Sequence, residues 1–315
     1  MRLLMAAAGL LLGSLVAGNA EACSTCGCTL NTDLGNQGVQ GGTGWRFDFR
    51  YDLVDQTQLR DGSQAITVSI PEPYEVERRT RNAYYDFGID YGFDRSWGIN
   101  VLMPFTGRFH STYDAGDTQL STSDYSHDLG DLRIIGRYTG FEPDMSTGIL
   151  FGLKLPTGST DAKFVSGPDQ GMLVDPTLQP GSGTTDALLG GYHFGEFGPY
   201  LGWFSQAIYE HALEEHAGFK PGDTFNLNAG LRLYVSDSVI PQLQLNYQIR
   251  SRDSGTAADP DNAGGRVLYL SPGVTFALDS GWHGFLFVQV PLHQYVNGLQ
   301  LTPTRIYSIG ISRSF

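Results

Sequence analysis

The chain lacks the features that mark helical membrane proteins, nucleic-acid binders and most soluble enzymes. After residue 22 it has no run of about 18 apolar residues, which excludes a transmembrane helix. Its 20 Lys and Arg against 33 Asp and Glu give a formal charge of −13, which argues against a nucleic-acid partner. No Walker, Rossmann, G-x-S-x-G or H-E-x-x-H motif occurs in a suitable setting. We therefore do not expect an enzyme.

Glycine and aromatic residues, by contrast, are abundant. The sequence contains 41 Gly, 18 Phe and 16 Tyr, whereas only 17% of its residues are charged. This composition suits a twisted sheet with girdles of aromatic side chains better than a soluble α/β enzyme.

The first 22 residues have the pattern of a secretory signal peptide. Arg2 supplies a positive charge before the apolar run Leu3–Val16. Ala20-Glu21-Ala22 then offers a small-x-small cleavage pattern before Cys23. Lipidation of Cys23 is the alternative to ordinary cleavage, although the residues before it fit a lipoprotein site poorly. We divide the chain into a signal peptide (1–22), a Cys- and Gly-rich segment (23–44) and a β-barrel (45–315).

Alternation of apolar and polar residues recurs along almost the whole chain. In residues 45–53, Trp, Phe, Phe, Tyr and Leu alternate with Arg, Asp, Arg and Asp, and 85–93 and 225–235 repeat the pattern. A tilted strand of about ten residues is long enough to cross a bilayer. We predict about twelve such strands, at 45–54, 83–93, 97–107, 129–140, 147–157, 184–194, 199–209, 224–235, 240–251, 266–277, 283–293 and 304–315.

Short and long connections alternate between these strands. Tight turns on the periplasmic side and longer loops outside are typical of up-and-down barrels. We predict an all-β fold, a transmembrane up-and-down antiparallel β-barrel in a bacterial outer membrane with both termini periplasmic. Ten or fourteen strands and a soluble β-sandwich are the alternatives. The short turns are at 94–96, 141–146, 195–198, 236–239 and 279–282, and the longer segments at 55–82, 108–128, 158–183, 210–223, 252–265 and 294–303.

The end of the chain favours the barrel. Tyr307, Ile309 and Ile311 share one side of an extended strand that ends in Phe315, and small polar residues take the other side. Such a strand resembles the closing strand of a bacterial outer-membrane barrel. An unpaired strand edge in hydrocarbon would leave backbone groups without hydrogen bonds, so the first strand near Trp45 must pair with this last one.

Charged residues alternate with the apolar positions and are therefore expected in the barrel lumen. Carboxylates concentrate on the first two strands, whereas cations without close acidic neighbours occur on the fourth, fifth, eighth and ninth. These groups either create a transverse field across a water-filled pore or pair into a network that fills a narrow interior. An Asn and Gln cluster between residues 226 and 248 either lines the path or is the ordinary polar face of two strands. The predicted lumen residues are Arg46, Asp48, Arg50, Asp52, Asp86, Asp90, Arg133, Arg137, Lys154, Arg232 and Arg250.

The three cysteines, Cys23, Cys26 and Cys28, lie directly after the predicted cleavage site. An odd number of thiols in an oxidising compartment leaves one unpaired or paired outside the chain. The spacing suits a Cu(I) or Zn²⁺ site or an exchangeable disulfide, with a structural disulfide or a lipidated Cys23 as alternatives. A functional site here would imply a periplasmic metal or thiol-redox partner protein. The polar segment from Thr29 to Gly44 either tethers this cluster beneath the pore or folds into the lumen as a small plug.

Histidine identifies no clear site. Glu210, His211, Glu214, Glu215 and His216 share a predicted external loop and could bind a divalent ion, although a solvated loop is the plainer interpretation. An outer-membrane hydrolase would need a nucleophile beside a base at the barrel rim, and the sequence locates none.

Three short motifs carry a resemblance to a known family. They are Leu153-Lys-Leu-Pro-Thr-Gly158, Leu178-Gln-Pro-Gly-Ser-Gly183 and Asp186-Ala-Leu-Leu-Gly190. They resemble outer-membrane proteins of the meta-pathway phenol-degradation type, loosely over residues 45–315. The resemblance implies a transporter of small, often hydrophobic molecules. The cysteine-rich start departs from the family pattern and favours metal-related cargo instead.

The predicted function is therefore a channel or transporter that sits in outer-membrane lipid and passes small solutes through a polar lumen. The alternative is a non-conducting outer-membrane protein that presents the cysteine segment to a periplasmic partner.

Overall fold

The computed structural model describes residues 29–33, 35, 37–38 and 43–315. In this part of the chain no helix is long and apolar enough to cross a membrane. Regular structure in the described residues consists of thirteen strands in one sheet and two short 3₁₀ turns, η1 (Pro176–Leu178) and η2 (Asp279–Gly281). The strands are β1 (Gly44–Gly62), β2 (Gln64–Ala65), β3 (Val76–Gly92), β4 (Trp97–Tyr113), β5 (Leu120–Leu129), β6 (Leu132–Tyr138), β7 (Thr147–Leu155), β8 (Asp186–Glu196), β9 (Leu201–Ala212), β10 (Thr224–Leu233), β11 (Val239–Arg250), β12 (Gly265–Ala277) and β13 (Trp282–Ser314).

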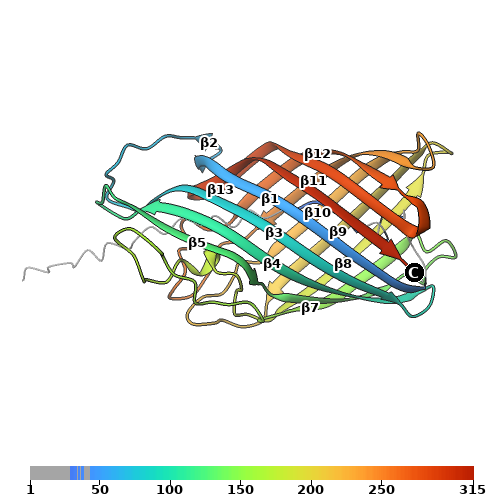
Figure 1. Cartoon of the computed structure of the whole chain (residues 1–315), viewed down its shortest axis with the longest axis horizontal. Coiled ribbons are helices and arrows are strands. Elements are labelled where there is room, and N and C mark those ends of the chain that lie inside the picture. The colour runs from blue at the N-terminus through green and yellow to red at the C-terminus, as the bar shows by residue number, and fades with distance from the viewer. Residues whose placement is uncertain (1–28, 34, 36, 39–42) are drawn as a thin grey trace, which may run out of the picture.

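The strands close into an antiparallel barrel (Figure 1). The ring runs from β1 through β3, β4 and β6 to β13, which pairs again with β1, and of the thirteen strands only β2 and β5 lie off this ring. The 33-residue β13 crosses the barrel twice, since His283–Val296 pairs with β12 and Val296–Ser314 pairs with β1. Both pairings are antiparallel, so the chain must reverse, and Gly298 has the positive φ of +60° that a tight turn requires. The eleven ring strands therefore make twelve crossings in the described residues, which confirms the predicted fold.

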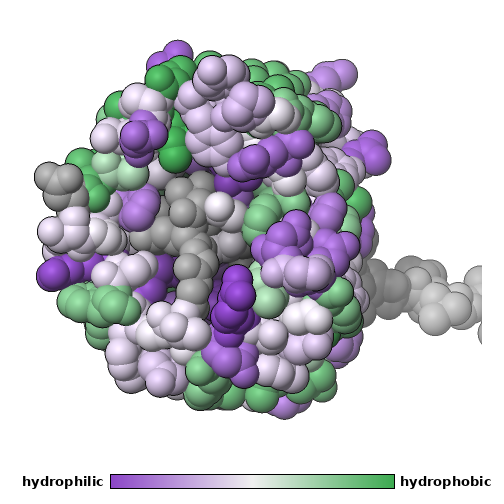
Figure 2. Space-filling model, turned by 90° about the vertical axis from the view of Figure 1, so that its right-hand side faces the viewer, coloured by the Kyte–Doolittle hydropathy of each residue, from purple (hydrophilic) through white to green (hydrophobic). Residues whose placement is uncertain are grey.

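The two faces of the wall differ as the alternation predicts. On β13, Tyr307, Ile309 and Ile311 are 44%, 53% and 40% exposed, whereas Ser308 and Ser312 are almost completely buried. Seen from the end that bears the C-terminus, hydrophobic side chains lie around the circumference and several strongly hydrophilic ones face the centre (Figure 2). This arrangement places lipid outside and polar groups inside.

The ends of the barrel also differ. The short connections between β3 and β4, β6 and β7, β8 and β9, β10 and β11, and β12 and β13 lie at the end that bears the C-terminus (Figure 1). The predicted short turns are therefore confirmed. The predicted loop at 294–303 is wrong, because these residues continue β13 around its turn at Gly298. The strand predicted at 129–140 corresponds to β6, which is shorter, whereas β5 was not predicted, because it lies in the segment 108–128 that was interpreted as a loop.

A proline accounts for the break between β5 and β6. Strand β4 pairs with β6 up to Leu102 and with β5 from Phe105, so that Pro104 lies at the junction. Proline has no N–H to donate to a ladder. Its carbonyl instead accepts a hydrogen bond of 2.8 Å from the Gly130 N–H, in the gap between the two strands.

Inward-facing aromatic rings cover glycines on neighbouring strands. A Cβ added at Gly273 would lie 2.0 Å from the Phe287 ring, and one added at Gly310 would lie 2.3 Å from the Phe285 ring. Both rings are buried and pack against Leu30 of the N-terminal segment. This contact explains why Phe285 and Phe287 interrupt the outward apolar pattern of β13.

Replacing Gly273 by alanine should therefore destabilise the barrel. Because the added methyl group overlaps the Phe287 ring, we expect Gly273→Ala to lower the free energy of unfolding by about 1–3 kcal/mol. Denaturant titration in detergent micelles, followed by tryptophan fluorescence, measures this change. Gly284→Ala is the matched control, since its nearest atom lies at 3.6 Å, and should leave stability unchanged or slightly higher. Equal stabilities of the two variants would contradict the packing described.

Candidate functional site: the barrel lumen

Three cavities follow one another along the lumen. Their volumes are about 370 Å³ in the half nearer the long loops, about 250 Å³ in the middle and about 330 Å³ at the short-turn end. The first two share Arg50, Asp86 and Arg133 in their walls, and the last two share Arg46 and Arg137. Charged groups from the predicted lumen set therefore lie where each cavity meets the next.

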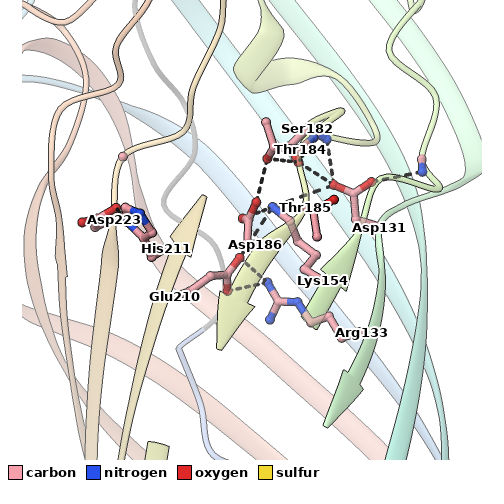
Figure 3. A network of polar contacts seen from close by, with 12 residues as sticks. Asp131, Arg133, Lys154, Ser182, Thr184, Thr185, Asp186, Glu210, His211 and Asp223 are labelled. Carbon is pink, nitrogen blue, oxygen red and sulfur yellow. Dashed lines mark hydrogen bonds and ion pairs between the residues drawn. The ribbon is translucent and has the colours of Figure 1, made fainter. Parts of the chain in front are cut away.

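A cluster centred on Lys154 lines the first cavity (Figure 3). The Lys154 ammonium contacts the Asp186 carboxylate directly and lies 3.6 Å from Glu210 and 3.9 Å from Asp131. The Arg133 guanidinium lies 3.1 Å from the other oxygen of Glu210. Three carboxylates thus share two cations, and all but Arg133 have side chains no more than 16% exposed. Mutual attraction offsets the cost of removing these charges from bulk water.

The same cluster fixes the long segment between β7 and β8. The Asp131 carboxylate accepts hydrogen bonds from the N–H groups of Gly158 and Ser182, at 3.0 and 2.8 Å. Gly158 and Gly181 approach so closely that a Cβ on either would lie 2.6 Å from the other backbone. The three motifs that carry the family resemblance therefore meet at one place, where glycine permits two backbones to touch.

A second set of ion pairs occupies the middle of the lumen. Arg50 contacts Asp52 at 2.8 Å and Asp86 at 2.6 Å. Nearer the short-turn end, Arg46 lies 3.1 Å from Asp48 and 3.7 Å from Asp90. Arg137 lies 3.1 Å from the same oxygen of Asp90.

The described part of the N-terminal segment lies inside the barrel. Asp33 contacts Arg46 at 3.1 Å, Thr32 accepts a hydrogen bond of 3.0 Å from Arg50, and Thr29 bonds to Gln289 at 3.2 Å. Leu30 is buried against Phe285 and Phe287. Of the two alternatives for this segment, the lumenal plug is therefore correct for residues 29–33.

The amide cluster on β10 and β11 forms a hydrogen-bonded ladder. Asn246 donates to Asn228 at 2.7 Å and to Gln244 at 3.3 Å, and Gln248 donates to Asn226 at 2.9 Å. Gln244 also donates to the Asn31 carbonyl at 3.1 Å. The ladder thus serves as a wall that binds the N-terminal segment, in addition to lining the lumen.

The cations predicted to lack acidic neighbours mostly have them. Arg133 pairs with Glu210 of β9, Arg137 with Asp90 of β3, and Lys154 with Asp186 directly opposite it on the neighbouring strand β8. Arg250 lies 2.7 Å from Asp253. The expectation of isolated cations is therefore wrong for these four. Arg232 differs, because it lies buried beside the rings of Phe204 and Tyr234 and has no carboxylate partner among the described residues.

Several lumen residues were missed. Asp33, Asp131, Asp186 and Glu210 complete the ion pairs described above. The predicted external loop is wrong for Glu210, because β9 continues to Ala212 and points Glu210 inward. Extending the alternation of that strand by one residue would have found it.

One side of the lumen is apolar. Val54, Val267, Tyr269 and Ile306 are buried together on β1, β12 and β13, with Tyr84 packed against them. These four buried residues line none of the three cavities.

The cysteines and histidines add no site to the described part of the chain. Cys23, Cys26 and Cys28 lie outside the described residues, so the Cu(I) or Zn²⁺ site stays a prediction. Within the described ranges no group of three His, Cys, Asp or Glu side chains is placed to hold a metal ion. His211 instead pairs with Asp223 at 2.6 Å, and Glu214 accepts a hydrogen bond of 2.8 Å from the Thr185 N–H.

These features define an outer-membrane-type β-barrel with a charged, partly occupied lumen. A solved outer-membrane channel from Pseudomonas putida F1 is similar to this chain with a TM-score of 0.65 at 10% identity, over 90% of this chain and 100% of that one. Toluene transporters from Ralstonia pickettii and Pseudomonas putida, TbuX and TodX, both give 0.47, at 10% and 9% identity, over 89% and 94% of this chain and 91% and 99% of theirs. At that score the two carry no argument about this chain.

No family model matches the chain, and no curated protein sequence does. The similarity to the Pseudomonas channel shows the fold alone. The meta-pathway phenol-degradation type therefore stays a prediction.

Lys154 should be coupled energetically to Asp186. Because Lys154→Met leaves three lumenal carboxylates with Arg133 alone, we expect a loss of about 2–3 kcal/mol in the free energy of unfolding. The double variant Lys154→Met/Asp186→Asn should lose at least 1 kcal/mol less than the sum of the single losses, roughly as coupled pairs do.

A solvent-exposed ion pair provides the control. Arg252 and Asp261 are 48% and 97% exposed, so Arg252→Met should change stability by less than about 0.5 kcal/mol. Additive losses at Lys154 and Asp186 would show that the two side chains do not interact.

Proposed function

We propose that the protein is an outer-membrane channel for small polar solutes. The observation that carries this proposal is the succession of three adjoining cavities along the lumen, with ionised side chains where they meet. The likeness to the Pseudomonas channel supports the general class. The cargo itself is inferred from the lining alone.

The lining favours polar over hydrophobic cargo. The first cavity is bordered by four cations, Arg50, Arg133, Lys154 and Arg250, and by five carboxylates, Asp52, Asp86, Asp131, Asp186 and Glu210. A hydrophobic solute in this space would displace water from charges and gain few apolar contacts in return. A solute with its own hydrogen-bonding groups has a smaller desolvation cost in this space. The near balance of charge further implies weak selectivity between cations and anions.

We further infer that the short-turn end faces the periplasm. In barrels of this kind the tight turns are periplasmic and the long loops are outside. Both Gly44 of β1 and the C-terminal Phe315 would then lie on the periplasmic side. The described N-terminal residues would enter the lumen from there and reach Gln289.

The N-terminal segment sets the width of the path in this proposal. Residues 29–33 line the second cavity together with charged residues of β1, β3 and β6. Removing the segment would open the space now filled by Leu30 and would free Arg46 and Arg50 from Asp33 and Thr32. The wild-type channel should accordingly conduct less than its shortened form.

Single-channel recording in planar bilayers tests this proposal. We expect discrete, weakly ion-selective conductance from the wild-type protein. Deletion of residues 29–33 should raise the conductance severalfold, because a segment buried in the lumen is lost. Liposome swelling with neutral sugars of increasing size should show a higher size limit for the deletion.

A deletion of the same length on the outside gives the control. Residues 114–118 form the exposed turn between β4 and β5, and their removal should leave conductance unchanged. A wild-type protein that neither conducts nor admits sugars, even after removal of residues 29–33, would rule out the channel.

A further inference from the structure

On β1, β3 and β13 the outward-facing side chains change from apolar and tyrosine to charged at the same level of the barrel. Ile309, Tyr51 and Tyr85 pair side by side across these strands, and Tyr307, Leu53 and Ala83 form the next outward-facing row. The Tyr51 and Tyr85 rings lie 5.0 Å apart. Tyrosine rings at the outward surface of a barrel are typical of the girdle where hydrocarbon meets head groups.

Basic side chains occupy the row directly above this girdle. Asp55 pairs with Arg81 of β3, and Arg305 of β13 lies beside Asp55 in the wall of one groove. Trp45 to Leu53 already supplies the length that a tilted strand needs to cross hydrocarbon, about 9–11 residues. The basic row therefore lies at the head-group level on the long-loop side.

This row carries a net positive charge, and one of its arginine side chains is held in place by an ion pair. Both oxygens of Asp55 accept hydrogen bonds of 2.9 Å from Arg79, whose side chain is 46% exposed. Arg81 and Arg305 are exposed and form no ion pair with any described residue. One carboxylate thus faces three guanidinium groups, which leaves a net charge of +2 on a protein whose overall charge is −13.

A groove in the outer wall adjoins these charges. Its volume is about 550 Å³, and it is bordered by Arg60, Arg305 and Asp55 above and by Val290, Pro291 and Tyr307 below. The ladder between β1 and β13 shifts register here, where Pro303 stands opposite Gln56. Because proline cannot donate a ladder hydrogen bond, the wall is locally opened.

We propose that this groove binds the phosphorylated head group of an outer-leaflet lipid, namely lipid A of lipopolysaccharide. Guanidinium groups bind phosphate through paired, charge-assisted hydrogen bonds. Arg81 and Arg305 flank the place where such a phosphate meets the barrel, and Arg79 is held beside them by Asp55. The apolar floor of Val290, Pro291 and Tyr307 continues into the lipid-facing wall, where an acyl chain would follow.

Lipid A fits better than an ordinary phospholipid because of its position and charge. The row lies on the long-loop side, which faces the outer leaflet in barrels of this class. Several cations spread across three strands suit a head group with more than one phosphate. The inference rests on the barrel fold and its orientation in the membrane, and it is independent of whether the lumen conducts.

The test compares lipid retained by two matched double variants purified from outer membranes in mild detergent. Arg81→Gln/Arg305→Gln removes one charge from the groove wall and one from the adjoining strand β3, and it keeps the Arg79–Asp55 pair. Arg95→Gln/Arg252→Gln removes two exposed charges elsewhere. Native mass spectrometry of wild-type protein should show bound lipid A. We expect the groove variant to retain at least fivefold less, and the control variant to differ from wild type by less than twofold.

Added lipids then identify the group that is bound. Wild-type protein in nanodiscs should bind bisphosphorylated lipid A at least fivefold more tightly than dephosphorylated lipid A or phosphatidylglycerol. Arg81→Lys/Arg305→Lys should recover part of the binding, because the charge returns without the planar fork. Equal retention by the groove and control variants would overturn the proposal, and so would equal binding of the dephosphorylated lipid or of phosphatidylglycerol. Faster electrophoretic migration of unheated samples verifies that every variant is folded.

Discussion

Hydrocarbon offers no water to an unpaired backbone N–H or carbonyl group, so a sheet that crosses it must have no free edge. The ladder between β1 and β13 meets this requirement, from Arg46 opposite Ser314 to Gly62 opposite Val296. Once the sheet is closed, its pleat sends alternate side chains to lipid and to the lumen. The apolar outer face, the polar interior and the aromatic rings that lie over inward-facing glycines are consequences of that closure.

The interior is too narrow for every charge to keep its own hydration, and the side chains pair instead. Lys154 and Arg133 lie among the carboxylates of β8, of β9 and of Asp131, which directly precedes β6. Arg46 and Arg50 each contact both the wall and the N-terminal segment. The network therefore has two structural roles. It holds the long segment after β7 over one end of the lumen, and it anchors residues 29–33 in the middle of the lumen. A polar path remains between these two contacts.

The local alternation of the sequence predicts which residues of the wall face the lumen, but it does not predict which side chains contact one another there. Period-two alternation placed Arg46, Asp86 and Arg232 inward because a strand has only two faces. Pairs such as Lys154 and Glu210 depend on the register and tilt of strands that are far apart in the chain. The local sequence does not specify either. Leu30 gave no pattern of its own, although the two inward phenylalanines of β13 were a signal that something apolar fills the lumen. The Asn297-Gly298 pair was a usable hairpin signal, but it lay in a segment interpreted as loop.

Nitroxide scanning of residues 306–312 in lipid vesicles tests the two-sided wall most directly, in protein whose three cysteines are replaced by serine. Labels at 307, 309 and 311 should be accessible to oxygen dissolved in lipid and protected from a water-soluble nickel complex. Labels at 306, 308 and 312 should be shielded from oxygen, because these positions are buried in the barrel. Accessibility that does not alternate along this stretch, or nickel contact at the odd positions, would contradict a lipid-facing barrel strand and with it the channel.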